Sequence, residues 1–160
     1  MIFQRRKNLT INKIRGIEVV TELKYLGVII NNTSGCFRRH KEGKIKQVRR
    51  MANMTYSVVH RSCNKLMIGK TYWKSVVMPA VLMGSSVVCR TRAELETMQR
   101  IENGVWRAVL GAPGCAPVVT LRGEVGTSNM HTRDLKTKIC YEKYLIENGN
   151  ELLKETYLET

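Results

Sequence analysis

The chain has 160 residues, and its 27 Lys and Arg residues against 13 Asp and Glu residues give a formal net charge of +14. A chain of this length can bury one ordinary hydrophobic core, and 43% hydrophobic residues exclude compositional disorder. No apolar run approaches the roughly 18 residues of a membrane-spanning helix, and the first residues lack the apolar stretch of a secretory signal peptide. We therefore expect a soluble, strongly basic intracellular protein without a membrane partner; the sequence does not separate nucleus from cytoplasm.

The first part of the chain has the patterns of short β-strands. Residues 9–14 alternate apolar and polar side chains, which is typical of a half-buried strand. Residues 17–20 and 25–30 are rich in β-branched side chains, and a loop signal follows at 31–35. A sheet of about two to four such strands is too small to be stable alone. The sequence therefore predicts a small sheet that needs neighbours.

From Phe37 onward the apolar residues recur at helical spacing. One stripe of the first predicted helix consists of Ile45, Val48, Ala52 and Val59. Basic side chains project from the opposite side, and Asn64 marks the predicted end.

Three further helices are predicted. One runs from about Lys70 to Val88 with a kink at Pro79. The next begins at a capping box of Thr91 and Glu94, and the last begins near residue 127 or 128. The predicted fold class is α+β and mostly α, with a short N-terminal β-hairpin region followed by a helical bundle.

Basic residues are concentrated at the start of the first predicted helix, with only Glu42 opposing them. Phosphate backbones attract such a stripe because each contact releases condensed counterions. The chain has no zinc-finger spacing and no arginine-plus-aromatic array, so sequence-specific base readout is not indicated. The alternatives are a solvated helix face or a surface for an acidic protein. The predicted nucleic-acid-binding residues are Arg38, Arg39, Lys41, Lys46, Arg49 and Arg50, and Lys44 lies in the same stretch.

The five cysteines do not form a recognisable metal site. They are odd in number, nearly evenly spaced and without a CxxC pair, so we expect reduced thiols, some of them buried. Cys36 with His40 and His60 with Cys63 offer two zinc-ligand pairs. A continuous helix of about twenty residues would hold these pairs roughly 30 Å apart, which is too far for one zinc ion. We predict no metal and no cofactor.

Catalytic carboxylates are also scarce. Asp134 is the only Asp in the chain. Two-metal phosphoryl transfer uses hard cations held about 3.5–4 Å apart by shared carboxylates. The three histidines have no nearby nucleophile at a spacing that indicates acid–base catalysis. We therefore predict no catalytic residue.

The segment Leu23-Lys24-Tyr25-Leu26-Gly27-Val28 resembles the one that follows the catalytic palm in reverse transcriptases of non-LTR (LINE-type) retrotransposons. In that family a KYLG strand belongs to a β-hairpin, the primer grip. Residues 1–3 are similar to the end of the preceding palm strand, and His40 falls where the family often has a histidine. Residues 72–84 resemble the thumb helix with its Pro and Gly, and residues 95–113 resemble the next helix. The resemblance covers roughly residues 1–130 and departs from the family at Met83 and Glu102.

The resemblance implies a palm tail and primer grip over residues 1–35, a thumb-like bundle over 36–113 and a helical connector over 114–160. Its primer-grip-like residues are Lys24, Tyr25, Leu26 and Gly27. The family's catalytic aspartates precede the segment that this chain resembles, so the chain is expected to be inactive as a polymerase. Its expected partners are an RNA or DNA duplex or hybrid and the polymerase part that would precede it.

The alternative is a stand-alone basic helical protein that binds an acidic protein or has no ligand. A thumb fragment should aggregate or need a partner sheet, because its N-terminal strands lack neighbours. A stand-alone module should be monomeric and unfold cooperatively.

Overall fold

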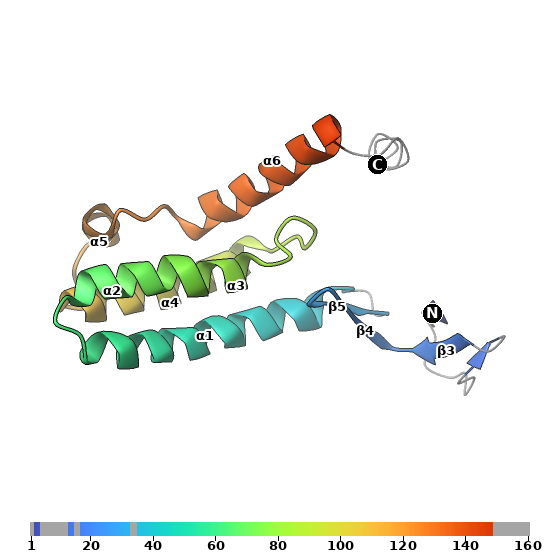
Figure 1. Ribbon diagram of the computed structural model, residues 1–160, viewed down its shortest axis with the longest axis horizontal. Helices are drawn as coiled ribbons and strands as arrows, with labels where there is room; N and C mark the ends of the chain where they lie inside the picture. The colour runs from blue at the N-terminus through green and yellow to red at the C-terminus, as the bar shows by residue number, and fades with distance from the viewer. Residues whose placement is uncertain (1, 4–12, 15–16, 33–34, 149–160) are drawn as a thin grey trace. The chain divides into compact units, whose positions relative to one another are not determined.

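The computed structural model describes residues 2–3, 13–14, 17–32 and 35–148 (Figure 1). This part of the chain is mostly helical, with short strands before residue 32, so the predicted α+β class is confirmed. Contacts divide the chain into two compact units, residues 1–47 and residues 48–160. The domain boundaries predicted after residues 35 and 113 remain predictions.

The first strands belong to the N-terminal unit. β3 (Ile17–Val20) lies between β1 (Ile2–Phe3), which is parallel to it, and β2 (Lys13–Ile14), which is antiparallel. Most of the strand predicted over residues 9–14 lies outside the described residues, and only its last two residues are seen, in β2.

β4 (Glu22–Tyr25) and β5 (Val28–Asn31) form an antiparallel hairpin in which Tyr25 pairs with Val28. Leu26 and Gly27 make the turn with positive φ angles of 46° and 84°. Two-residue turns with both φ positive match the right-handed twist of the strands. Tyr25 of the β-branched segment 25–30 thus ends one strand, and Val28 begins the next, because Gly27 allows a reversal between them.

α1 (Arg38–His60) begins in the N-terminal unit and continues into the second. His40 is buried, and its Nδ1 accepts a hydrogen bond of 3.3 Å from the backbone N–H of Ile29 in β5. This bond ties the start of the helix to the hairpin within the N-terminal unit. Lys44 is also buried, unlike most of the basic residues around it.

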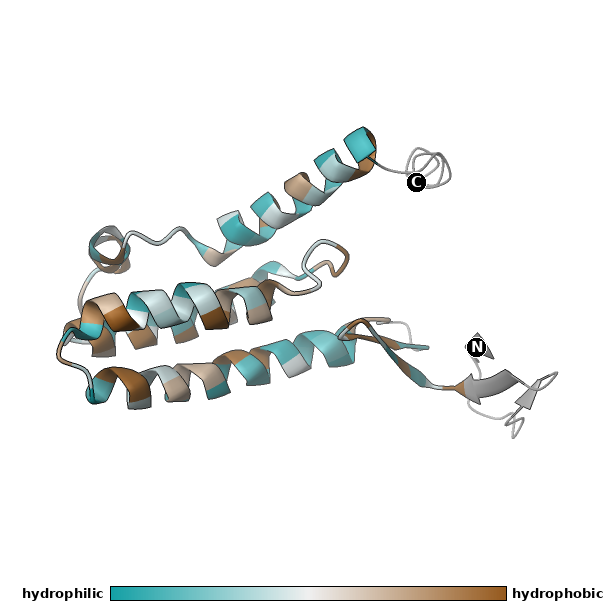
Figure 2. Cartoon of the chain, in the orientation of Figure 1, coloured by the Kyte–Doolittle hydropathy of each residue, from teal (hydrophilic) through white to brown (hydrophobic). Residues whose placement is uncertain are grey.

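The predicted apolar stripe of α1 is confirmed in the second unit. Val48, Ala52 and Val59 are buried, and so is the hydroxyl-bearing Thr55. Figure 2 shows the same gradient along the helix, with hydrophilic residues in the first turns and more hydrophobic residues toward its end. α1 is thus a charged helix at its start and a packed helix at its end.

The helix predicted over residues 70–88 starts earlier and ends sooner than expected. It consists of α2 (Lys65–Tyr72), a π-helical segment η1 (Trp73–Val77) and α3 (Met78–Leu82). The side chain of Asn64 accepts a hydrogen bond from the Met67 N–H and so fixes the true start. The irregularity expected at Pro79 is a π turn, because a proline ring clashes with the carbonyl four residues before it in a regular helix.

α4 (Arg92–Leu110) begins as predicted. The Thr91 hydroxyl accepts from the Glu94 N–H at 3.3 Å, and the Thr91 N–H donates to the Glu94 carboxylate at 2.7 Å. Gly111, with φ 64°, ends the helix. α5 (Val118–Val125) and α6 (Met130–Asn148) follow.

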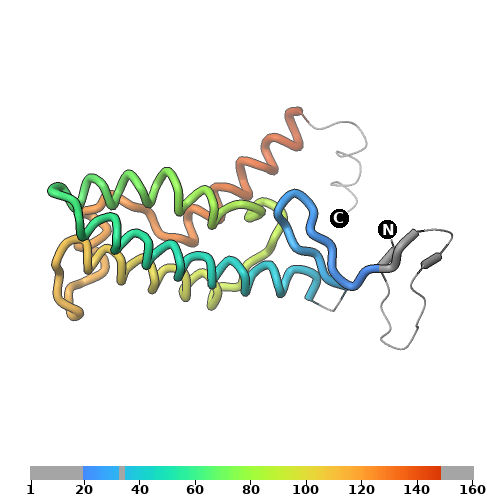
Figure 3. Tube along the Cα trace, turned by 60° about the horizontal axis from the view of Figure 1, so that its bottom comes forward, coloured from blue at the N-terminus to red at the C-terminus, as the bar shows by residue number. Residues whose placement is uncertain are grey.

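The second unit has a hydrophobic core in which α1, α2 and α4 approach closely, and Figure 3 traces these helices side by side. A Cβ atom added at Gly69 of α2 would lie 3.2 Å from a methyl group of Val59 and 3.4 Å from Val109. Trp73 and Trp106 are fully buried and meet edge to face, with ring centroids 5.7 Å apart. Both tryptophans are core residues.

All five cysteines lie within the described residues, are exposed and form no disulfide, so the expectation that some are buried is wrong. No helix among the described residues is long and apolar enough to cross a membrane. The described part of the chain also contains no cluster of three or more residues suited to hold a metal ion.

Candidate nucleic-acid interface

The predicted basic residues lie on α1, and most of them face solvent. Arg39, Lys46 and Arg50 are all exposed, and their spacing of seven and four residues places them on one helix face. Arg38 and Arg49 are exposed beside them. Lys41 is half-buried. The helix therefore gathers five exposed cations, and we call these residues, Arg38, Arg39, Lys46, Arg49 and Arg50, the basic face of α1.

Two of these cations have carboxylate partners. Arg38 binds Glu42 one turn along the helix at 3.1 Å, and both side chains are largely exposed. Arg39 forms an ion pair with Glu22 of β4. Exposed ion pairs of this kind contribute at most about 1 kcal/mol, so the charges remain available to a stronger polyanion. The Arg39 pair nevertheless gives that residue a role in attaching the hairpin to α1.

The other three cations of the basic face are Lys46, Arg49 and Arg50. Among the described residues, no carboxylate lies within ion-pair distance of Lys46, Arg49 or Arg50. Uncompensated exposed cations retain their full hydration and their full attraction for phosphate. Among the predicted residues, these three are therefore the best candidates for contacts with phosphate.

The four primer-grip-like residues lie at the tip of the β4–β5 hairpin. Lys24 is exposed, and Tyr25 and Leu26 keep 61% and 76% of their surface exposed. Leu26 also holds a left-handed backbone conformation, which costs about 1–2 kcal/mol in a residue with a side chain. The hairpin therefore presents an aromatic ring, an aliphatic side chain and a cation to solvent at one end.

A buried ionic network, which the sequence did not predict, joins distant parts of the second unit. The Arg90 guanidinium donates to Asp134 of α6 at 2.9 Å, to the Val81 carbonyl at 2.9 Å and to the Ser85 hydroxyl. Lys138 adds a second cation at 2.7 Å from the other Asp134 oxygen. The only Asp of the chain is thus buried and saturated, which makes it a structural residue.

Glu102 is fully buried and forms a second ionic cluster in the same unit. Its carboxylate accepts from Arg133 at 2.9 Å, from the Trp106 indole at 3.3 Å and from Gln99 at 3.2 Å. Glu102 is one of the two positions at which the chain departs from the reverse-transcriptase pattern, and Arg133 of α6 supplies its counter-charge here. Neither buried carboxylate is open to a substrate or a metal ion.

Comparisons with known proteins found no matching family model, no matching curated protein and no matching solved structure.

Proposed function

We propose that the chain binds the phosphate backbone of a nucleic-acid duplex through the basic face of α1, without reading base sequence and without catalysing a reaction. The observation that carries this proposal is the set of exposed cations Lys46, Arg49 and Arg50 on one helix, which have no carboxylate partner within the described ranges. Such a surface recognises the shape and charge of a backbone, because no base-reading motif accompanies it.

The resemblance to non-LTR reverse transcriptases gives this binding a context. We propose that the chain corresponds to a primer-grip hairpin and thumb, which hold a template–primer for a polymerase part on another segment. The hairpin over β4 and β5 and the helical second unit are compatible with this assignment. An RNA–DNA hybrid is accordingly the first ligand to test.

The decisive experiment measures the affinity for a labelled RNA–DNA hybrid by fluorescence anisotropy at several salt concentrations. Lys46→Gln combined with Arg50→Gln removes two cations that have no carboxylate partner among the described residues. The slope of log K against log salt is expected to fall in magnitude by roughly 2, because each lost phosphate contact removes about 0.9. Arg39 is less suitable for this test, because it also binds Glu22 of the hairpin.

The matched control is Lys65→Gln with Lys74→Gln, which removes the same charge from exposed positions on α2 and η1. This control should leave the slope nearly unchanged. An unchanged slope in the Lys46 and Arg50 variant, or an equal fall in the control, would contradict the assignment to α1.

The packed core of the second unit favours one alternative, a stand-alone helical protein that binds an acidic protein. Polyglutamate distinguishes the two. If polyglutamate displaces the hybrid at equal concentrations of negative charge, the acidic-protein function is favoured. If the hybrid binds much more tightly at the same salt concentration, the nucleic-acid function stands.

A further inference from the structure

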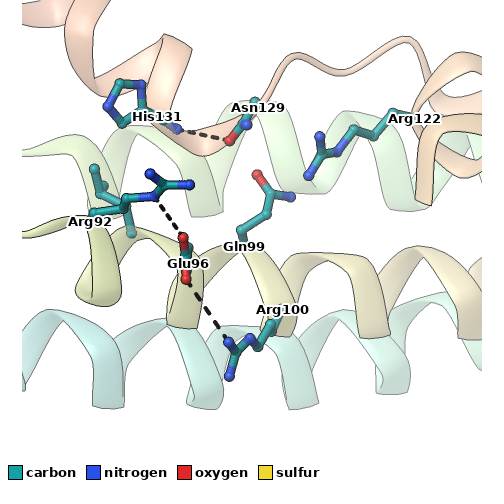
Figure 4. Close-up of a pocket in the computed structure, with 8 residues that line it drawn as sticks. Arg92, Glu96, Gln99, Arg100, Arg122, Asn129 and His131 are labelled. Atoms are coloured by element: carbon teal, nitrogen blue, oxygen red, sulfur yellow. Dashed lines mark hydrogen bonds and ion pairs between the residues drawn. The ribbon is translucent and has the colours of Figure 1, made fainter.

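The second unit contains an open cleft of about 580 Å³ on the side of α4 that faces α5 and the start of α6 (Figure 4). Its polar lining is rich in guanidinium groups, with one carboxylate among them. The lining residues are Arg92, Leu95, Glu96, Gln99, Arg100, Arg122, Asn129 and His131. None of them belongs to the basic face of α1.

The charges of the cleft do not cancel. Glu96 is the only carboxylate of the lining, and it lies 2.9 Å from Arg92 and 4.0 Å from Arg100. In Figure 4 Glu96 lies between Arg92 and Arg100. One carboxylate against three guanidiniums leaves an excess of two positive charges, and an anion would neutralise it.

Arg122 is the arginine of the lining that lacks a hydrogen-bond acceptor among the described residues. Within the described residues its guanidinium makes no hydrogen bond and no ion pair, and its Nε is buried. In Figure 4 the guanidinium points toward the side chains of Gln99 and Asn129. Arginine stays charged in proteins, and a partly buried guanidinium without an acceptor loses hydration that nothing replaces. Its terminal nitrogens are available to two oxygens of one ligand.

The floor of the cleft is fixed before any ligand arrives. Gln99 donates to Asn103 at 2.9 Å and accepts from the Met130 N–H at 2.7 Å, so its amide holds the start of α6 against α4. Asn129 accepts from the His131 N–H at 3.0 Å. α5 is anchored by Leu121 and Val125, which are buried on either side of Arg122. A site with fixed walls loses little conformational freedom on binding.

We propose that this cleft binds a phosphate group, with Arg122 as its main ligand and Arg92 and His131 on the opposite side. Two guanidiniums that face one space suit a tetrahedral dianion, because each can donate two hydrogen bonds to it. The volume also admits more than a single phosphate, so a diphosphate or a phosphate within a larger molecule can enter. The site lies entirely in the second unit and is independent of the function proposed for α1.

Isothermal titration of the full chain with inorganic pyrophosphate tests this proposal. Arg122→Gln is expected to weaken binding at least about tenfold, since hydrogen bonds between charged groups are being removed. Arg122→Lys keeps the charge but not the two-pronged geometry, so an intermediate loss of about threefold is expected. Lys65→Gln, which removes a charge outside the cleft, should change the affinity by less than about twofold. Thermal unfolding of each variant verifies that the fold is retained.

A second titration in the presence of the RNA–DNA hybrid identifies the source of the phosphate. Displacement of pyrophosphate by the hybrid would assign the cleft to a backbone phosphate, and simultaneous binding would assign it to a free phosphate or a nucleotide. The absence of pyrophosphate binding up to about 1 mM, or equal binding by Arg122→Gln, overturns the proposal. The function proposed for α1 is tested separately. Lys46→Gln with Arg50→Gln leaves the cleft intact, so it should change binding of the hybrid without changing binding of pyrophosphate.

Discussion

The two units of the chain differ in their buried hydrophobic side chains and in their net charge. Residues 48–148 contain all the described hydrophobic side chains that are buried, including Trp73, Trp106 and Met98. In residues 20–32 and 35–47, no hydrophobic side chain is buried to that degree. Charge is distributed the other way: residues 1–47 hold 11 Lys and Arg against 3 Glu, a net +8, whereas the longer remainder has 16 against 10, a net +6.

This difference predicts which substitutions change the free energy of unfolding and which change ligand binding. In the second unit, buried carboxylates and guanidiniums neutralise one another, so charge contributes to a specific arrangement of α4 and α6. In the first unit, the positive charge exceeds the negative charge, and Arg38, Arg39 and Lys46 of α1 are exposed. Substitutions of the buried ionic residues should therefore alter the free energy of unfolding, and substitutions of the exposed cations of α1, on both sides of residue 47, should mainly alter ligand binding.

The largest expected effect is at Glu102. Glu102→Ala leaves Arg133 and the Trp106 indole without their buried acceptor, and we expect a loss of about 3–5 kcal/mol in the free energy of unfolding. Urea denaturation followed by circular dichroism measures it. Glu96→Ala on the same helix removes an exposed carboxylate and should cost about 1 kcal/mol or less. Equal losses in the free energy of unfolding would mean that the buried contacts of Glu102 stabilise the fold no more than the exposed ion pairs of Glu96.

The two tryptophans allow a finer test of the Glu102 contacts. Trp106→Phe removes a hydrogen bond to a buried carboxylate, whereas the Trp73 indole N–H has no hydrogen-bond partner among the described residues. Both changes remove similar volume from the core. We expect Trp106→Phe to be less stable than Trp73→Phe by about 1–2 kcal/mol in the same denaturation assay. The reverse order would contradict the Glu102 assignment.

In the N-terminal unit, the hairpin turn should gain stability on substitution. Leu26→Asn places a residue that tolerates the left-handed conformation at φ 46°, and a gain of about 1 kcal/mol is expected. Hydrogen exchange of the β4 and β5 amides measures this local gain. Gly27→Ala places a side chain at φ 84° and should destabilise the turn. It should therefore not slow hydrogen exchange at any of these amides. If the exposed Leu26 side chain contacts the nucleic acid, Leu26→Asn will also weaken binding of the RNA–DNA hybrid.

The smallest expected effect is at Gly43. A Cβ atom there would meet nothing within 4 Å, so Gly43→Ala should stabilise α1 by about 0.5–1 kcal/mol through lower entropy of the unfolded chain. Thermal unfolding provides the measurement. Gly69→Ala is the comparison in the second unit, where the new methyl group lies 3.2 Å from Val59 and offsets that gain. A larger gain at Gly69 than at Gly43 would show that α2 is packed more loosely than described.

Local patterns in the sequence predicted local structure well. The stripe of Val48, Ala52 and Val59 and the capping box of Thr91 with Glu94 depend on side chains a few residues apart, and both are confirmed. The π turn was missed because a proline inside an apolar helix predicts a disturbance without specifying its form. The β-branched side chains of residues 25–30 indicate strand but do not locate the turn, which Leu26 and Gly27 form.

Pairings between distant residues could not be predicted in this way. Arg90 and Asp134 are 44 positions apart, and Glu102 and Arg133 are 31 apart, so no periodicity connects them. The cleft around Arg122 depends on the same long-range packing, because its lining comes from three helices. The basic residues of α1 were found from sequence because they are clustered along the chain, but the burial of Lys44 was not.

The exposure of the cysteines has a practical consequence. Four of the five sulfhydryl groups lie in the segments that connect secondary-structure elements, at Cys36, Cys63, Cys89 and Cys115. Each of these four junctions therefore carries its own alkylation site. Iodoacetamide footprinting read out by mass spectrometry would report junction by junction which loops an added ligand shields, with Cys140 on α6 as an internal reference.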